Sequence, residues 1–410
     1  MRGLTASLAW RGLALLGCAV LLWFSICVSL GARFGNSPFY QVALRWWPHN
    51  ADALATAAAG QLTADDDQER RAKVQALAQA ALRRSPLSVS AFRTLGLIAQ
   101  MEGQEREASK LADAAETLSR RDLATQLWLI QNCVARSDLD CALHHYDVAL
   151  RTSDGSERIL FPTLVNTLDD PAIRSRLVTI LRQQPNWRLS FLDNAVRYTH
   201  SSDDVANLAS DLEHAGSPMA PDIAALLLSR LVNEGKVERA AQLYRLYRPG
   251  PPLGEGPWPL DSHFTARDRL GPFGWVTMDQ GGAYATFSAD ASGGQARSNL
   301  VISVAPLATG TVARQLLLLP PGPILVVSRY NGSGTGNTAS MRWRIVCENS
   351  GALAIDMPLP AAARSQSMSG IVPTVNCPTQ SLELYVDGSD MVEAMTAEID
   401  SIAIRRLPKQ

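Results

Sequence analysis

The sequence lacks the short motifs by which catalytic sites are usually recognised. It contains no His-Glu-x-x-His, no Gly-x-Ser-x-Gly and no Gly-x-x-x-x-Gly-Lys-Ser/Thr segment. Its glycine-rich stretch, 331–337, is followed by neither a lysine nor a helical pattern, so it is typical of a hairpin loop and not of a phosphate site. Because no nucleophile, acid or base constellation is present, we expect a protein that is not an enzyme.

An excess of either charge is also absent. The 410 residues include 38 Lys and Arg against 39 Asp and Glu, which gives a formal net charge of −1. Proteins that bind nucleic acids carry a basic patch that neutralises phosphates. The composition therefore predicts no nucleic-acid partner.

The cysteines and histidines show none of the spacings that are typical of zinc sites. None of the six cysteines belongs to a Cys-x-x-Cys pair. The adjacent His144 and His145 lie in a helical pattern beside positions that pack. We expect them to be polar side chains at the surface or between helices, and not metal ligands.

Four of the cysteines form two candidate disulfides. Cys347 and Cys377 each lie at the edge of a predicted strand, and Cys133 and Cys141 are eight residues apart on consecutive predicted helices. Both pairs would form in an oxidising compartment. The pairing stays a hypothesis here, because connectivity cannot be deduced from sequence alone.

Charged residues are missing from one long run, Gly12–Ala32. As a helix, its 21 residues span about 31 Å, which matches the hydrocarbon core of a bilayer. Only a helix satisfies the backbone polar groups of a single segment in that medium. We therefore expect residues 12–32 to form a transmembrane anchor.

The arginines that flank this run predict its orientation. Arg2 and Arg11 precede it and Arg33 follows it, so the positive-inside rule places residues 1–11 in the cytoplasm. The expected protein is a single-pass protein of the inner membrane with its body in the periplasm. A cleaved signal peptide is the alternative.

Residues 37–248 are rich in alanine and leucine and repeat with a period of 34. Leu95 recurs as Leu129 and Ala108 recurs as Ala142, each 34 residues later. Two helices in 34 residues are typical of the tetratricopeptide repeat, and the segment resembles that family. The resemblance implies an α-solenoid that binds a protein partner.

The pattern changes after residue 248. The segment 249–263 is rich in proline and glycine, which cannot continue a helix, and it is expected to be a linker between domains. Beyond it, residues 264–408 show short alternating runs separated by turn residues. The expected strands are 283–288, 299–304, 311–318, 324–330, 340–347, 367–372, 382–386 and 397–405.

Strands of this number and length predict an antiparallel β-sandwich, most simply a jelly roll. The run from Gln315 through Pro320-Pro321-Gly322 to Ser328, together with the final strand Glu398–Ile404, resembles the galactose-binding-like sandwich of carbohydrate-binding modules. This resemblance implies a fold and leaves the ligand open. The whole chain is therefore expected to be multidomain, α followed by β.

Candidate sugar-binding residues are polar or aromatic side chains on one side of a strand. Alternation places Tyr385 with Glu383 and Asp387, away from the apolar face. Tyr330 and Arg329, at the end of another expected strand, are the next candidates. The alternative for Tyr385 is an ordinary exposed strand tyrosine.

Three acidic residues could supply oxygen ligands to a structural calcium ion. They are Asp387, Asp390 and Asp400, of which the first two lie in a short loop sequence, Asp-Gly-Ser-Asp. The loop is too short for an EF-hand, and a plain turn is the alternative. Calcium is the only cofactor that the sequence suggests.

Two functions follow from this organisation. The first is a membrane-tethered scaffold or adaptor in the bacterial cell envelope that supports exopolysaccharide or envelope-glycan assembly through protein contacts of the helical array. The second is a carbohydrate-binding protein whose sandwich recognises a polysaccharide.

Overall fold

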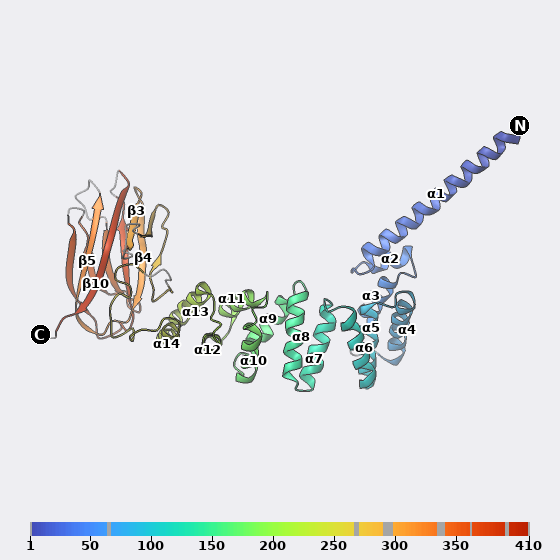
Figure 1. Ribbon diagram of the computed structural model, residues 1–410, viewed down its shortest axis with the longest axis horizontal. Coiled ribbons are helices and arrows are strands. Elements are labelled where there is room, and N and C mark those ends of the chain that lie inside the picture. Colours follow the sequence, from blue (N-terminus) through green and yellow to red (C-terminus); the bar gives the residue numbers. More distant parts are fainter. Residues whose placement is uncertain are drawn as a thin grey trace. The chain divides into compact units, whose positions relative to one another are not determined.

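The computed structural model describes residues 2–63, 67–265, 270–289, 298–333, 341–360, 363–389 and 393–408. Helices occupy the N-terminal part of the chain and strands the C-terminal part (Figure 1). The chain divides into two compact units, Met1–Pro162 and Thr163–Gln410. The expected order of α followed by an antiparallel β-sandwich is confirmed.

The first helix, α1 (Arg2–Phe34), contains the predicted anchor. Its segment Leu16–Phe34 is long and apolar enough to cross a membrane, although a signal sequence would satisfy the same criterion. The large apolar side chains of this segment are exposed, among them Leu21, Leu22 and Phe24. The structure therefore contains a helix that suits either a membrane span or a signal sequence.

Helix α2 (Tyr40–Trp46) folds back against α1. Trp46 contacts Trp23 with 5.4 Å between ring centroids, and Trp47 contacts Phe24 at 6.1 Å. The end of α1 is also joined to α3 (Ala51–Gln61), because the hydroxyl of Thr56 donates to the carbonyl of Gly35 at 2.8 Å. Helix α1 is thus packed into the first unit at its C-terminal end.

The remaining helices of the first unit form consecutive pairs. Helices α5, α7 and α9 begin at Val89, Leu123 and Glu157, so their starts are 34 residues apart. The helices are α4 (Gln68–Arg84), α5 (Val89–Met101), α6 (Glu105–Leu118), α7 (Leu123–Ala135), α8 (Leu139–Thr152) and α9 (Glu157–Asn166). The spacing is that of the predicted repeat, while membership of the tetratricopeptide family stays a prediction.

Small residues let these helices approach one another. A Cβ atom on Gly96 of α5 would lie 2.5 Å from Cη2 of Trp128 on α7, so no other residue fits there without movement. The Trp128 indole nitrogen donates to the side-chain oxygen of Gln100. Trp128 is 4% exposed and fills the space between the pairs. The Leu-Gly pair found in the sequence is therefore a contact point between successive pairs.

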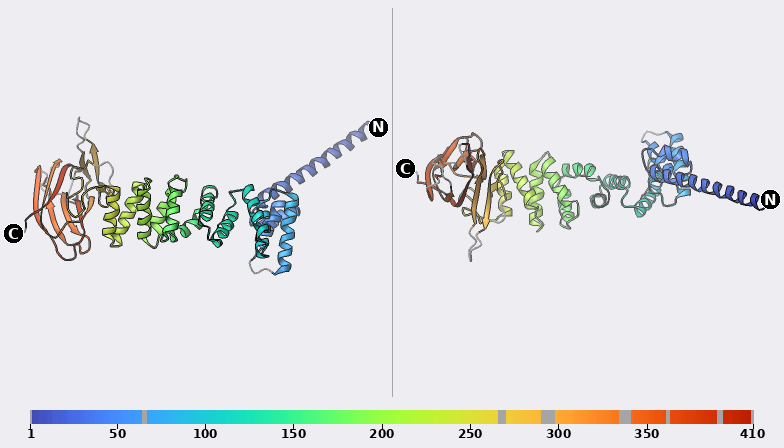
Figure 2. Two further views of the ribbon diagram at one scale, coloured as in Figure 1. Left: turned by 60° about the horizontal axis from the view of Figure 1, so that its bottom comes forward. Right: turned by 90° about the horizontal axis from the view of Figure 1, so that it is seen from above.

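In the second unit, five helices lie side by side next to the sandwich (Figure 2). One buried cation ties two of their turns together. The guanidinium of Arg188 donates to Ser217 Oγ at 2.7 Å and to the carbonyls of Ser217 and Pro218 at 2.8 and 2.7 Å. The five helices are α10 (Pro171–Leu181), α11 (Arg188–Tyr198), α12 (Ser202–His214), α13 (Pro221–Asn233) and α14 (Val237–Tyr247).

The segment 249–263 packs on the sandwich instead of acting as a free linker. Trp258 is 9% exposed, its indole donates to the carbonyl of Leu253 at 2.8 Å, and its own carbonyl accepts from the amide of Ile404 at 2.8 Å. Tyr244 of α14 also contacts Phe273 at 5.3 Å between ring centroids. Helices after residue 162 and the sandwich therefore belong to one unit, which differs from the expected domain boundary.

The sandwich consists of two five-stranded antiparallel sheets. The first has the order β1-β4-β9-β6-β7 and the second the order β2-β3-β10-β5-β8. The strands are β1 (Val276–Thr277), β2 (Ala283–Ala289), β3 (Ser298–Val304), β4 (Thr309–Leu317), β5 (Gly322–Ser333), β6 (Met341–Cys347), β7 (Leu353–Pro358), β8 (Ser365–Val372), β9 (Gln380–Asp387) and β10 (Met395–Arg406). Strands β1 and β7 have no counterpart among the strands expected from sequence.

Tryptophans and a disulfide lie in the core between the sheets. Trp343 is fully buried, contacts Trp275 at 5.8 Å and donates to Ser328 Oγ at 3.1 Å. A disulfide joins Cys347 to Cys377, with 5.0 Å between their Cα atoms. The described chain has a second disulfide, between Cys133 and Cys141 of the first unit.

Replacing Gly96 with alanine should destabilise the first unit. The new methyl group would overlap the Trp128 ring, and overpacking of this kind costs about 1–3 kcal/mol. Gly60→Ala is the matched control, because a Cβ there meets nothing within 4 Å and alanine favours a helix by roughly 1 kcal/mol. Thermal unfolding followed by circular dichroism should show a lower Tm for the first variant and an equal or higher Tm for the second. Equal behaviour of the two would contradict the packing role of Gly96.

Acid should weaken the second unit through Glu234. Burial alone would raise the pKa of this carboxyl, but hydrogen bonds from Ser202, Arg230 and Lys236 outweigh it and lower the pKa to about 2. A carboxylate whose pKa is depressed contributes stability at neutral pH that is lost as the pH falls from about 4.5 toward 2.

The measurement is urea unfolding of the parent protein and of Glu234→Gln at pH 7 and at pH 3.5. We expect the variant to be less stable than the parent at pH 7 and to lose less stability on acidification. An identical pH dependence for both proteins would show that Glu234 has no such role.

Candidate functional site

The outer surface of the first sheet carries the candidate site, which we call the β9 face. Strand β9 turns Leu382, Leu384 and Val386 into the core, where each is fully buried. Alternation then turns Glu383 and Tyr385 outward, and both are partly exposed. The sequence-predicted placement of these two side chains on one face is what the structure shows.

Neighbouring strands add charged side chains to the β9 face. Arg342 of β6 is paired with Tyr385 of β9, and Arg344 is paired with Glu383. On the other side of β6, Asp356 of β7 is paired with Arg344. The Nη1 atom of Arg342 lies 3.1 Å from Asp356 Oδ2, so one carboxylate holds the first arginine in place.

The guanidinium of Arg344 lies over the ring of Tyr385, 3.7 Å from its centroid. A cation above an aromatic face is held by the ring quadrupole. The Nε atom of Arg344 is buried and has no hydrogen-bond partner within the described structure, since Asp356 Oδ1 is 3.7 Å away. The stack is thus ordered and retains one donor that nothing in the chain satisfies.

The acidic groups of the face are oriented by short side chains. Glu383 accepts hydrogen bonds from Thr311 Oγ1 at 3.3 Å and from Ser381 Oγ at 3.1 Å. Asp387 accepts from the hydroxyl and the amide of Ser389 at 2.7 and 3.1 Å, and these bonds lower the pKa of its carboxyl. Both carboxylates therefore remain ionised acceptors at neutral pH.

The charges of the β9 face balance. Three arginines face three carboxylates: Arg314, Arg342 and Arg344, and Glu383, Asp356 and Asp387. A surface of this kind offers many donors and acceptors without a net field that would attract a polyanion. It suits a neutral ligand with several hydroxyl groups.

The other two sugar-binding candidates lie elsewhere. Tyr330 is 1% exposed and its hydroxyl donates to the carbonyl of Pro360 at 2.9 Å, so it belongs to the core, contrary to the expectation from sequence. Arg329 is exposed, but it belongs to β5 in the second sheet. Neither residue joins Tyr385 on the β9 face.

The expected calcium ligands are not brought together. Asp387 ends β9 in the first sheet, whereas Asp400 lies exposed on β10 in the second sheet. The third residue, Asp390, lies outside the described residues. Two groups of possible metal ligands occur among the described residues, and neither contains Asp387 or Asp400. A calcium ion stays a prediction.

Three residues of the face were missed by the site prediction. Arg342 and Arg344 show the alternation of a half-buried strand, which was the available signal, but alternation does not reveal which strand lies beside β9. Asp356 lies on β7, an edge strand that the sequence did not predict.

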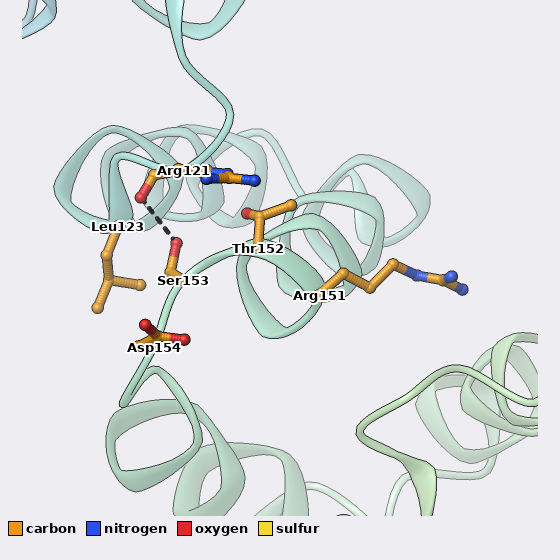
Figure 3. Close-up of a pocket in the computed structure, with 6 residues that line it drawn as sticks. All are labelled: Arg121, Leu123, Arg151, Thr152, Ser153 and Asp154. Carbon is orange, nitrogen blue, oxygen red and sulfur yellow. Dashed lines mark hydrogen bonds between the residues drawn. The ribbon is translucent and has the colours of Figure 1, made fainter.

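A separate pocket of about 540 Å³ lies in the first unit, lined by Arg121, Leu123, Arg151, Thr152, Ser153 and Asp154 (Figure 3). Its polar groups are used within the protein. Ser153 donates to the carbonyl of Arg121 at 3.0 Å, and Arg151 forms an ion pair with Asp147 at 2.8 Å. Figure 3 shows the Arg151 side chain extending away from Leu123 and Asp154. The lining converges on no common point, so the β9 face remains the better candidate.

Comparison with known proteins gives solved structures only. No protein-family model matches the sequence, and no curated protein matches it. The C-terminal part is similar to a xylan-binding CBM22-1 domain of Paenibacillus barcinonensis Xyn10C, with 11% identity over 36% of this chain and 94% of that one, at a TM-score of 0.26.

A second similar structure is the N-terminal cellulose-binding domain of Cellulomonas fimi β-1,4-glucanase C, with 16% identity over 36% of this chain and 95% of that one, at a TM-score of 0.22. A third, a carbohydrate-binding module of the β-sandwich superfamily, has 15% identity over 36% of this chain and 62% of that one, at a TM-score of 0.25. At these identities and TM-scores the similarities carry no statement about what this chain binds.

Proposed function

We propose that this protein is a membrane-anchored carbohydrate-binding protein whose β9 face binds a neutral polysaccharide. The observation that carries the proposal is the Arg344–Tyr385 stack, set among carboxylates and arginines whose charges balance. No catalytic group is needed for this role.

The chemistry of the face matches that of a sugar. A pyranose presents apolar C–H patches together with hydroxyls that both donate and accept hydrogen bonds. The carboxylates of Glu383 and Asp387 would accept hydroxyl protons, and the free Nε donor of Arg344 would bind a hydroxyl or ring oxygen. The ring of Tyr385 and the stem of Arg344 would contact the C–H patches.

The rigidity of the face favours binding. Arg342 is held by Asp356 and Arg344 by the Tyr385 ring, so fewer side-chain rotamers are lost when a ligand arrives. A face built on strands is also positioned more accurately than one built on loops.

Helix α1 is proposed to be retained as a single-pass anchor. The contacts of Trp46 with Trp23 and of Trp47 with Phe24 support retention, since cleavage after α1 would remove the packing partners of both rings. Two disulfides support an oxidising compartment such as the periplasm for the body of the chain. The proposed orientation has residues 1–11 in the cytoplasm.

The helical pairs are proposed to bind a protein partner, as tetratricopeptide-like pairs would. The 34-residue spacing of α5, α7 and α9 supports this second role. Together, the anchor, the pairs and the sandwich would hold a partner near a polysaccharide of the cell envelope, which suits exopolysaccharide assembly.

Replacing Tyr385 with alanine should weaken polysaccharide binding about tenfold or more, because the mutation removes the ring and the support of Arg344. The matched control is Tyr284→Ala, another exposed strand tyrosine that lies on β2 in the second sheet. Full-length protein in detergent would be tested on a glycan array and then by calorimetry with the best ligand. Circular dichroism would establish that both variants are folded.

Two outcomes would count against this assignment. If the parent binds no glycan on the array, with or without calcium, the sandwich has no such function. If both tyrosine variants lose affinity equally, or neither does, the β9 face is the wrong surface.

The mature protein should keep residues 1–34. Intact-mass measurement of protein purified from the membrane fraction should give the full-length mass, and the protein should resist extraction with alkaline carbonate. A mature chain that begins between residues 20 and 39 would identify α1 as a signal sequence and exclude the anchor.

A further inference from the structure

A cluster of metal-binding side chains lies far from the β9 face in sequence, within the first unit. Glu116 comes from α6, and His144 and His145 come from α8. One ring nitrogen of each histidine and one oxygen of Glu116 lie within 4.8 Å of one another. Neither the proposed function nor the comparisons assign any role to these residues.

His145 is held in the manner of a metal-bound histidine. It is 8% exposed, and its Nδ1 lies 2.9 Å from Oε1 of Gln126, a fully buried residue of α7. Donation from Nδ1–H to this amide oxygen fixes the ring and leaves Nε2 with its lone pair. Histidines that bind metals commonly donate their other ring nitrogen to such an acceptor.

The spacing of the cluster suits a small transition-metal ion. In a tetrahedral zinc site with bonds of about 2.0–2.1 Å, ligand atoms are roughly 3.3 Å apart. Glu116 Oε1 lies 3.6 Å from the ring of His145, measured to Nδ1. His144 is exposed and Glu116 partly so, which leaves their side chains free to rotate onto an ion.

We propose that Glu116, His144 and His145 bind a divalent transition-metal ion, represented by Zn²⁺, with Gln126 orienting His145. Two imidazoles and one carboxylate are ligands that Zn²⁺ accepts, and the fourth position would hold water. The ion would join α6 to α8, helices of consecutive pairs, and so brace the array at this point.

A disulfide beside the cluster decides which ligands are available. The sulfur atoms of Cys133 and Cys141 also lie within 4.8 Å of a ring nitrogen of His145. In the structure these sulfurs are bonded to each other, so they cannot act as thiolate ligands. The proposed set is therefore that of the oxidised protein, and a rival set would exist only after reduction.

The test is zinc binding by the full-length, oxidised protein in detergent, without a histidine tag, titrated against a chromophoric zinc chelator. We expect one Zn²⁺ per chain with a Kd in the micromolar range or tighter. Glu116→Gln and His144→Ala should each weaken binding about tenfold or more, and His200→Ala, an exposed histidine outside the cluster, should not change it. Replacement of the exposed His144 avoids disturbing the core, and Tm values of all variants would verify folding.

Two results would overturn the proposal. One is an equal zinc affinity for the parent, Glu116→Gln and His144→Ala. The other is zinc binding that appears only after the disulfide has been reduced and that Cys141→Ser abolishes, which would assign the ion to the cysteine set. A supporting measurement is Co²⁺ substitution, since a tetrahedral site gives intense visible absorption that His144→Ala should remove.

Discussion

The close approach of Trp128 to the backbone at Gly96 is the constraint on which the helical part depends. With no side chain at Gly96, the indole of α7 lies directly against α5, and α8 follows α7 after a short turn. That placement brings His144 and His145 beside Glu116 of α6. A packing contact between apolar groups thus determines where a polar cluster forms, although the two share no residue.

In the sandwich, the same relation holds between the core and the surface. Burial of Leu382, Leu384 and Val386 fixes the register of β9, and a shift by one residue would turn Tyr385 into the core. Pairing with β6 then sets Arg344 above the tyrosine ring. The face that we propose for sugar binding is therefore as precisely defined as the apolar layer beneath it.

The sequence predicted the parts of this structure that depend on periodicity. The period of 34 anticipated the spacing of Val89, Leu123 and Glu157, and alternation anticipated the outward direction of Tyr385. Alternation should also have placed Tyr330 in the core, since it shares a face with Ile324 and Val326, but its position near the end of the expected strand suggested exposure. The rest depends on contacts distant in sequence. Trp258 packs on the final strand, and Asp356 reaches the site through an edge strand that ends at Pro358, neither of which local pattern reveals.

The contact between α1 and α2 has a consequence for the shape of the membrane. Trp23 lies midway along residues 12–32, and Trp46 packs against it, so α2 runs beside the second half of that span. Phe39, Val42 and Trp46 are exposed there and would meet lipid. With residues 12–32 in the bilayer, the protein has the cross-section of two helices in the leaflet nearer its body and of one helix in the other. Such a wedge displaces more lipid from one leaflet than from the other, and it would favour membranes that curve toward the narrower side.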